Sequence, residues 1–147
     1  MFKLPASERL LHWRTFRKKL DALTLPAAAL ETTQFWAQCP FSPYYLDIDT
    51  PKLWPDAWTL LSDNWYCDIA KSLAMIYTLC YTKHSPDMEL RSYHDPDSNY
   101  DYNLVWINNG DLILNLEVGE VVNKACIKKD WKLIRCFKKA DLKLDNY

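Results

Sequence analysis

The spacing of apolar residues predicts helices in the first half of the chain. Apolar side chains recur at helical spacing over residues 7–23, and basic residues crowd the opposite face. A second helix is expected over residues 26–38, because proline suits the first helical turn and Cys39-Pro40 ends the pattern. A short helical segment follows around residues 58–61. The clearest helix runs over residues 67–81, where a broad apolar face predicts burial.

Beyond Pro86 the period changes to two, which predicts strands. The expected strands cover residues 89–93, 102–107, 111–116, 121–122 and 132–137. Asn108-Asn109-Gly110 is a strong hairpin signal between the second and third of them, because Asn and Gly tolerate positive φ. Helices come first and an antiparallel β-meander second, so the predicted class is α+β, with the N-terminal helices and the helix carrying Cys67 packed on the sheet.

The length of 147 residues fits one domain with a sizeable core. Its expected parts are a helical N-terminal part over residues 1–39, an aromatic- and proline-rich loop over 40–66, a helix over 67–84, an antiparallel sheet over 88–138 and a tail over 139–147.

Composition excludes several classes of protein. Two glycines cannot build Gly-rich phosphate loops or dinucleotide fingerprints. The five cysteines are widely spaced without a CxxC pair, which argues against a zinc site or a disulfide framework and favours a reducing compartment. No apolar run approaches the ~20 residues that span a bilayer, and the N-terminus lacks a signal-peptide core. We therefore expect a cytoplasmic protein with no cofactor, no metal and no membrane partner.

Charge and aromatic content bear on partners. Basic side chains predominate before residue 40 and after residue 123, and acidic ones in between. These faces either pair with each other in the fold or form a bipolar surface that docks onto an assembly. Seven Trp and nine Tyr exceed what core packing usually requires, so we expect some aromatic surface to contact a partner. Oligomeric state stays open.

Two further patterns have a plain reading and a functional one. Lysines and aromatics alternate over residues 128–139, as in nucleic-acid-binding segments, but the acidic middle of the chain and a pI near 6.3 disfavour such a partner. Residues 95–99 read DPDSN, which resembles part of a calcium loop. The segment lacks the glycine and the distal Glu of such a loop, so a turn is favoured.

Cys67 is the candidate for chemistry. It opens a predicted helix, where backbone N–H groups and the helix dipole stabilise a thiolate and favour nucleophilic attack. The alternative is a small buried apolar residue, which is common for free cysteines. His94, at the end of a predicted strand, is the candidate for a non-standard base, whereas His12 is expected to be a partly buried packing residue.

The order of three segments resembles the bacterial transglutaminase-like cysteine proteinases, which have a papain-like fold. A Trp-containing segment leads into the Cys67-Asp68 pair, and two strands follow at residues 102–106 and 112–116. The resemblance covers roughly residues 54–123. It implies a nucleophile at Cys67, a general base at Asn103 and an orienting acid at Asn115.

Asparagine changes what this resemblance implies. The amide of Asn103 cannot accept a proton from a thiol, and Asn115 can only orient a neighbour by hydrogen bonding. A Cys-Asn-Asn set predicts an inactive domain used as a protein-binding or structural subunit, with residues 41–58 and the groove around Cys67 and Asn103 as its contact surface. The small, aromatic-rich, glycine-poor chain is also similar to proteins of tailed bacteriophages, which predicts a phage assembly, in host cytoplasm or virion. The alternative is a cytosolic cysteine hydrolase or acyltransferase that uses Cys67 with His94.

Overall fold

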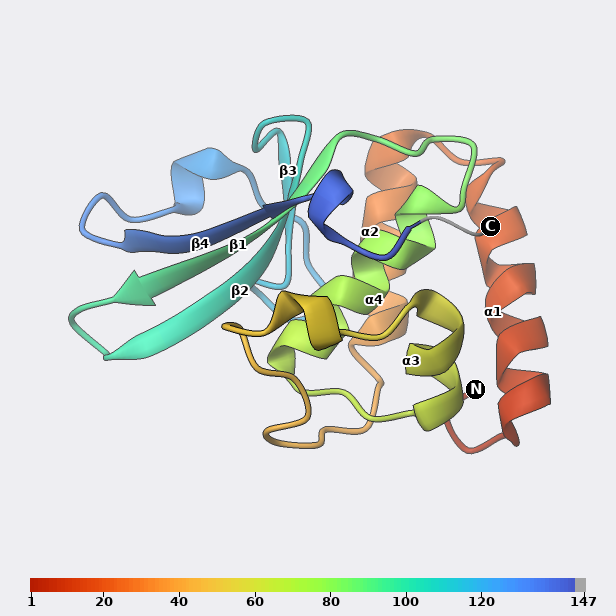
Figure 1. Cartoon of the computed structure of the whole chain (residues 1–147). Helices are drawn as coiled ribbons and strands as arrows, with labels where there is room; N and C mark the ends of the chain where they lie inside the picture. Colours follow the sequence, from red (N-terminus) through yellow and green to blue (C-terminus); the bar gives the residue numbers. More distant parts are fainter. Residues whose placement is uncertain (145–147) are drawn as a thin grey trace.

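The computed structural model describes residues 1–144 of the chain. Within them, helices precede strands, which confirms the predicted α+β class. The elements are α1 (Ala6–Leu20), α2 (Leu25–Trp36), α3 (Ala57–Asp63), α4 (Asp68–Cys80), β1 (Met88–Asp95), β2 (Tyr100–Ile107), β3 (Leu112–Leu114) and β4 (Lys132–Lys138), with 3-10 turns at Pro51–Leu53, Lys124–Cys126 and Lys139–Asp141. The helices lie on one side and the sheet on the other, with α4 between them (Figure 1).

Local chemistry sets the helix ends. The Thr24 side chain accepts a hydrogen bond from the N–H of Ala27 at the start of α2, where a proline occupies the first turn. Asp56 caps α3 in the same way through the N–H of Thr59, and α3 ends at Asn64 in a left-handed conformation with φ of 59°. α3 therefore ends at Asp63, shortly before the start of α4. The first helix ends at Leu20, three residues earlier than its apolar pattern predicts.

The sheet is antiparallel with strand order β3-β2-β1-β4. β1 and β2 pair along their whole length, from Met88↔Ile107 to Asp95↔Tyr100. The predicted turn at residues 108–110 joins β2 to β3, and all three residues have positive φ. The strand expected at residues 121–122 is reduced to a single bridge between Ile113 and Val122. β4 departs from a simple meander, because it pairs with the free edge of β1 instead of with β3.

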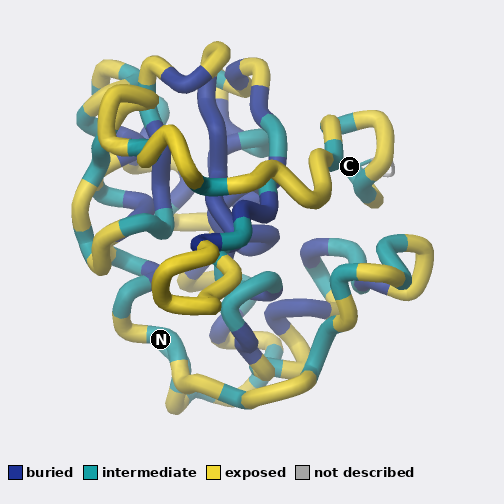
Figure 2. Tube along the Cα trace, turned by 90° about the vertical axis from the view of Figure 1, so that its left-hand side faces the viewer, coloured by how far each residue is buried: buried dark blue, intermediate teal, exposed yellow. Residues whose placement is uncertain are grey.

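The main core lies between α4 and the face of the sheet that carries Leu90 and Val105. Thr78 of α4 joins three helices in this core. Its hydroxyl accepts hydrogen bonds from the indole N–H groups of Trp13 at 3.0 Å and Trp36 at 2.9 Å, and donates to a backbone carbonyl one turn earlier. Figure 2 shows the buried stretches gathered inside the molecule and the exposed ones in its outer loops. None of the helices in residues 1–144 is long and apolar enough to cross a membrane.

A second, smaller apolar cluster covers the opposite face of the sheet. Tyr93, Leu104, Trp106 and Ile113 form it, and the segment between β3 and β4 folds over them. Arg91 lies over the ring of Trp106 at 4.0 Å, a cation–π contact. Both faces of the sheet are therefore covered, although helices cover only one of them.

The core contains more of the aromatic side chains than the composition alone predicts. Trp13, Trp36 and Trp54 are almost fully buried. The indole N–H of Trp54 donates to the Asp47 carbonyl within the loop of residues 40–55, and its ring packs on Phe137, which fixes the loop to the body. The aromatic residues that stay exposed are a small group, comprising Phe41, Tyr44, Trp65 and Tyr100. Because three of these four surround one cavity, described below, the aromatic surface is local.

The segregated charges pair in part. Arg135, in the basic C-terminal stretch, lies 2.8 Å from Asp49 in the acidic middle of the chain, whereas the Lys19–Glu31 pair, at 3.5 Å, lies within the N-terminal stretch. Both pairs are largely exposed, so each contributes about 0–1 kcal/mol. Several lysines between residues 128 and 138 remain exposed. The predicted tail lies partly outside the described residues, which end at residue 144.

Candidate functional site

Cys67 stands at the N-cap of α4, as its position in the sequence predicts. Its backbone is extended and its carbonyl accepts the hydrogen bond from the N–H of Lys71 at 2.9 Å. The side chain is 7% exposed and makes no capping hydrogen bond. A bridge between Phe41 and Tyr66, supported by the N–H of Ser42 donating to the Tyr66 carbonyl at 3.0 Å, holds the aromatic loop against the residue that precedes Cys67.

Two cavities meet at Cys67. The first has a volume of about 320 Å³, and its lining is Phe41, Pro43, Tyr44, Leu46, Cys67, Asp68, Ile69, Tyr100 and Asn103. The second, of about 240 Å³, is lined by Ala37, Cys39, Phe41, Tyr66, Cys67, Asp68, Lys71 and Val118. Because Phe41, Cys67 and Asp68 belong to both, the two form one groove that passes the start of α4. We name it the Cys67 groove.

Asp68, the residue after Cys67, organises the floor of this groove. The amide of Asn103 donates to its Oδ2 at 3.0 Å, and the amide of Asn115 donates to its Oδ1 at 3.2 Å. The same Asn115 nitrogen lies 2.7 Å from the hydroxyl of Ser72 and 3.0 Å from the carbonyl of Asn103. Ser72 in turn donates to that carbonyl at 2.6 Å. The structure thus brings both predicted asparagines to the start of α4.

Asn115 does not lie in a strand, contrary to the prediction of a strand over residues 111–116. β3 ends at Leu114, and Asn115 has a left-handed backbone with φ of 70°. Asparagine tolerates this conformation better than most residues. The chain turns after Leu114, and this turn brings the amide of Asn115 to Asp68. The strand is therefore shorter than predicted.

No proton acceptor of the usual kind faces the thiol. Among the described residues, no histidine lines either part of the groove. His94, the predicted alternative base, has its Nδ1 2.6 Å from Asp101 Oδ1 on the neighbouring strand, and that pair lies outside the groove lining. Both carboxylate oxygens of Asp68 already accept amide hydrogens. Next to Cys67, the lining of both cavities thus presents a carboxylate that is already hydrogen-bonded to two asparagine amides.

The groove lies in a partly dehydrated environment. Burial raises the pKa of the Cys39 thiol to about 11, although Lys71 acts in the opposite direction. Burial likewise raises the pKa of Tyr66, and burial together with the charge of Asp68 raises the pKa of Tyr100. These groups are neutral at physiological pH. Asp68 and Lys71 are then the charged side chains of the lining, with Lys71 confined to the second cavity.

Residues 95–99 form a turn, as predicted. Asp95 accepts hydrogen bonds from the N–H of Asp97 at 2.9 Å and from the hydroxyl of Ser98 at 2.9 Å. Asp130, which the sequence did not connect to this turn, brings a third carboxylate, and the three groups lie within 4.8 Å of one another. Asp130 raises the pKa of Asp97 by hydrogen bonding and repulsion. Oxygen ligands of this kind suit a hard divalent cation, but two of the three side chains are exposed.

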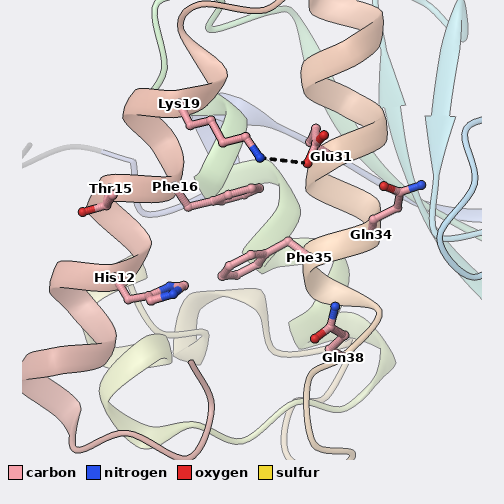
Figure 3. Close-up of a pocket in the computed structure, with 8 residues that line it drawn as sticks. All are labelled: His12, Thr15, Phe16, Lys19, Glu31, Gln34, Phe35 and Gln38. Atoms are coloured by element: carbon pink, nitrogen blue, oxygen red, sulfur yellow. Dashed lines mark ion pairs between the residues drawn. The ribbon is translucent and has the colours of Figure 1, made fainter.

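A larger groove of about 440 Å³ lies between α1 and α2 (Figure 3). The rings of Phe16 and Phe35 stack there with centroids 4.1 Å apart, and an ion pair between Lys19 and Glu31 spans it. His12 is exposed and stacks on Phe35, instead of being partly buried as its sequence position suggests. The groove shares no lining residue with the Cys67 groove and contains no cysteine or paired acids, so it offers no catalytic set.

Sequence reasoning missed the two residues that hold the asparagines in place. Asp68 and Ser72 are four residues apart on α4 and therefore share one helix face. That spacing was the available signal, but only the pairing of β2 and β3 shows that both asparagines approach this face. Of the predicted contact segment, residues 41–58, only its first part lines the groove.

The chain has an α+β fold of the transglutaminase-like, papain-like kind, with a cysteine at the start of its central helix. No protein-family model and no curated protein sequence matches the chain. This assignment of the fold therefore comes from comparison with solved structures.

Two solved structures of LapG from Legionella pneumophila, a bacterial transglutaminase-like cysteine protease, are similar to this chain. The calcium-bound form superposes with a TM-score of 0.72 at 14% identity, covering 92% of this chain and 77% of LapG. The other gives a TM-score of 0.70 at 15% identity, covering 90% and 75%. At these identities the likeness concerns the fold.

Proposed function

We propose that this chain is a catalytically inactive transglutaminase-like domain that acts as a protein-binding or structural subunit. The Cys67 groove is its binding site, and an extended segment of a protein partner is its ligand. Similarity of composition to tailed-phage proteins is the basis for assigning the subunit to a bacteriophage assembly, in the host cytoplasm or the virion.

One observation carries the proposal. The amides of Asn103 and Asn115, at the positions of the base and the acid, both donate to Asp68. An amide nitrogen that donates to a carboxylate has no lone pair to offer a thiol, and an amide is not a base at physiological pH. The groove nevertheless persists, with an exposed aromatic wall beside it. A groove without its base is suited to recognition.

A display experiment tests the proposal. A library of random linear peptides is selected on the folded protein, and the enriched peptides are re-tested on Tyr44→Ala. Tyr44 lines the groove and is 97% exposed, so its truncation leaves the fold intact. Leu53→Ala, in the same loop at 77% exposure and outside the groove lining, is the matched control. We expect peptides that bind the protein and Leu53→Ala equally and bind Tyr44→Ala at least about tenfold more weakly.

Mass spectrometry of the same samples separates binding from catalysis. We expect the peptides to be recovered intact and the protein mass to be unchanged after prolonged incubation. A cleaved peptide, or an acyl adduct on Cys67, would overturn the proposal in favour of a cysteine hydrolase or acyltransferase, with His94 to be examined as its base. Enriched peptides that ignore the Tyr44 substitution would place binding elsewhere on the molecule.

A further inference from the structure

The larger part of the Cys67 groove is enclosed by aromatic rings. Phe41 and Tyr44 enter it from the loop after α2, and Tyr100 enters from the start of β2. The three residues are 73%, 97% and 51% exposed, and the ring of Tyr100 also packs edge-on against Tyr102, with the ring centroids 4.7 Å apart. Aromatic faces carry partial negative charge and attract cations that approach within about 6 Å of the ring centre.

Tyr44 is presented at a conformational cost. Its backbone is left-handed, with φ of 61°, which is unusual for an aromatic residue, and its side chain gains almost no burial in return. Residues held in such conformations cluster at ligand-binding sites. The strain is consistent with a ring kept available for a partner.

The charged group of this cavity is an acceptor. Asp68 contributes a carboxylate, and none of the cavity's lining residues is a lysine, arginine or histidine. Asn103 is 7% exposed, and its amide nitrogen already donates to Asp68, whereas no described group donates to its buried Oδ1. Because the surface of this oxygen is buried, the carboxylate of Asp68 is the charged acceptor that the lining offers a ligand. Lys71 lines the second cavity of the groove and not this one.

From this combination we infer that the cavity binds a lysine or arginine side chain of the partner segment. The cation lies against the rings of Phe41, Tyr44 and Tyr100, and its N–H groups donate to the carboxylate of Asp68. The apolar stem of the side chain contacts Leu46 and Ile69 of the lining. An acidic side chain is repelled by Asp68, and an apolar one leaves the charge of Asp68 without a counter-ion in this cavity. The inference rests on the proposed function, since it names the residue that the groove recognises.

Blocked pentapeptides test it directly. The probes are acetyl-Ala-Ala-X-Ala-Ala-amide with X as lysine, arginine, glutamine, leucine or glutamate, titrated into isotope-labelled protein and followed by NMR chemical shifts. We expect the lysine and arginine probes to bind at least about tenfold more tightly than the other three, because charge-assisted hydrogen bonds and cation–π contacts add to each other. The shifts should centre on Tyr44, Asp68 and Tyr100, and the preference should weaken with added salt.

Two substitutions report on the mechanism. Asp68→Asn removes the charge, and we expect the lysine probe to bind about tenfold more weakly. Because Asp68 also holds the groove floor, its thermal unfolding is measured in parallel. The second variant is Tyr44→Ala. Because the Tyr44 side chain is exposed, its removal leaves the fold intact, and Leu53→Ala is the control. Equal binding of the lysine, leucine and glutamate probes, shifts centred outside the groove, or unchanged binding to Tyr44→Ala would each overturn the inference.

The outcome is separable from the fate of the proposed function. Display-selected peptides that bind the groove without a lysine or arginine would overturn the cation site and leave the binding function standing. If neither the pentapeptides nor any displayed peptide binds the groove, both are wrong. Peptides that bind and are then cleaved would retain the cation site and replace the binding function with an enzymatic one.

Discussion

Replacing Asn115 with aspartate is a direct test of the hydrogen-bond network at the groove floor. The Asn115 nitrogen lies 3.2 Å from Asp68 Oδ1, 2.7 Å from the Ser72 hydroxyl and 3.0 Å from the Asn103 carbonyl. Asn115→Asp keeps the shape of the side chain and tolerates the left-handed backbone, but it replaces a donor with an acceptor among acceptors.

The expected cost follows from these distances. Two unit charges about 3 Å apart repel by about 5 kcal/mol at an effective dielectric constant of about 20, and partial exposure of the site reduces this by roughly half. Loss of the amide hydrogen bonds adds about 1 kcal/mol. We therefore expect Asn115→Asp to lower the free energy of unfolding by about 3 kcal/mol at neutral pH.

The sign of the pH dependence is a second expectation. The new carboxyl lies against Asp68, so its pKa in the folded state should be raised above its value in the unfolded chain. The protonated form can donate to Asp68 and restores a hydrogen bond. The stability deficit should therefore shrink as pH falls through the raised pKa and grow as pH rises through it.

Urea denaturation followed by tryptophan fluorescence at neutral and mildly acidic pH measures both quantities. Asn123→Asp is the matched control, because Asn123 is exposed and its Oδ1 accepts from the N–H of Ala125, a role that aspartate can keep. We expect the control to change stability by less than about 0.5 kcal/mol. The reasoning would be refuted if Asn115→Asp were as stable as the control at neutral pH, or if its deficit did not depend on pH.

Three other predictions concern the core, the cysteines and acid stability. Thr78→Val leaves two buried indole N–H groups without an acceptor and should lower the free energy of unfolding by about 2–4 kcal/mol in urea denaturation. Thr78→Ser keeps the acceptor and should lower it by about 1 kcal/mol. The reverse order would contradict the hydrogen bonds described. In iodoacetamide labelling read by peptide mass spectrometry near pH 8, Cys39, with a pKa of about 11, should react about a hundredfold more slowly than exposed Cys126, and equal rates would show that Cys39 is not buried. The thiol of Cys136 and the guanidinium of Arg91 donate to Glu89 and lower its pKa, so the stability advantage of the protein over Glu89→Gln should be complete at neutral pH and decline below the usual glutamate range; an advantage that grows on acidification would contradict this.

The fold was predictable where local chemistry decides the structure. The turn at residues 108–110 follows from asparagine and glycine at positions of positive φ, and only glycine fits at its third position, because a Cβ on Gly110 would lie 2.4 Å from the ring of Trp106. The helix that begins after Cys67 follows from its broad apolar face. The pairing of β4 with β1 could not be predicted in the same way, because it depends on a contact between strands separated by two others in the chain.

The site was predictable in its positions and not in its bonds. Cys67 at a helix start and Asn103 in a strand can be read from the sequence, whereas Asn115 lies just after a strand and not in it. The direction in which each amide points depends on the turn after Leu114 and on the register of β2, and neither is written in a local pattern. The sequence therefore does not predict that Asp68 accepts hydrogen bonds from both asparagines, whereas the fold shows it.

The hydrogen-bond network at the groove floor supports the proposal of a binding site. In a thiol enzyme of this architecture, the groups that approach the start of the central helix have to accept and orient a proton. Here the same two positions donate to Asp68, and Ser72 ties the β2 backbone to α4. These hydrogen bonds connect the floor of the groove to two strands, and the aromatic wall stays exposed on a loop anchored at Tyr66. Under the proposed function, a floor connected in this way beside exposed rings would bind an extended segment at a small ordering cost in the protein itself.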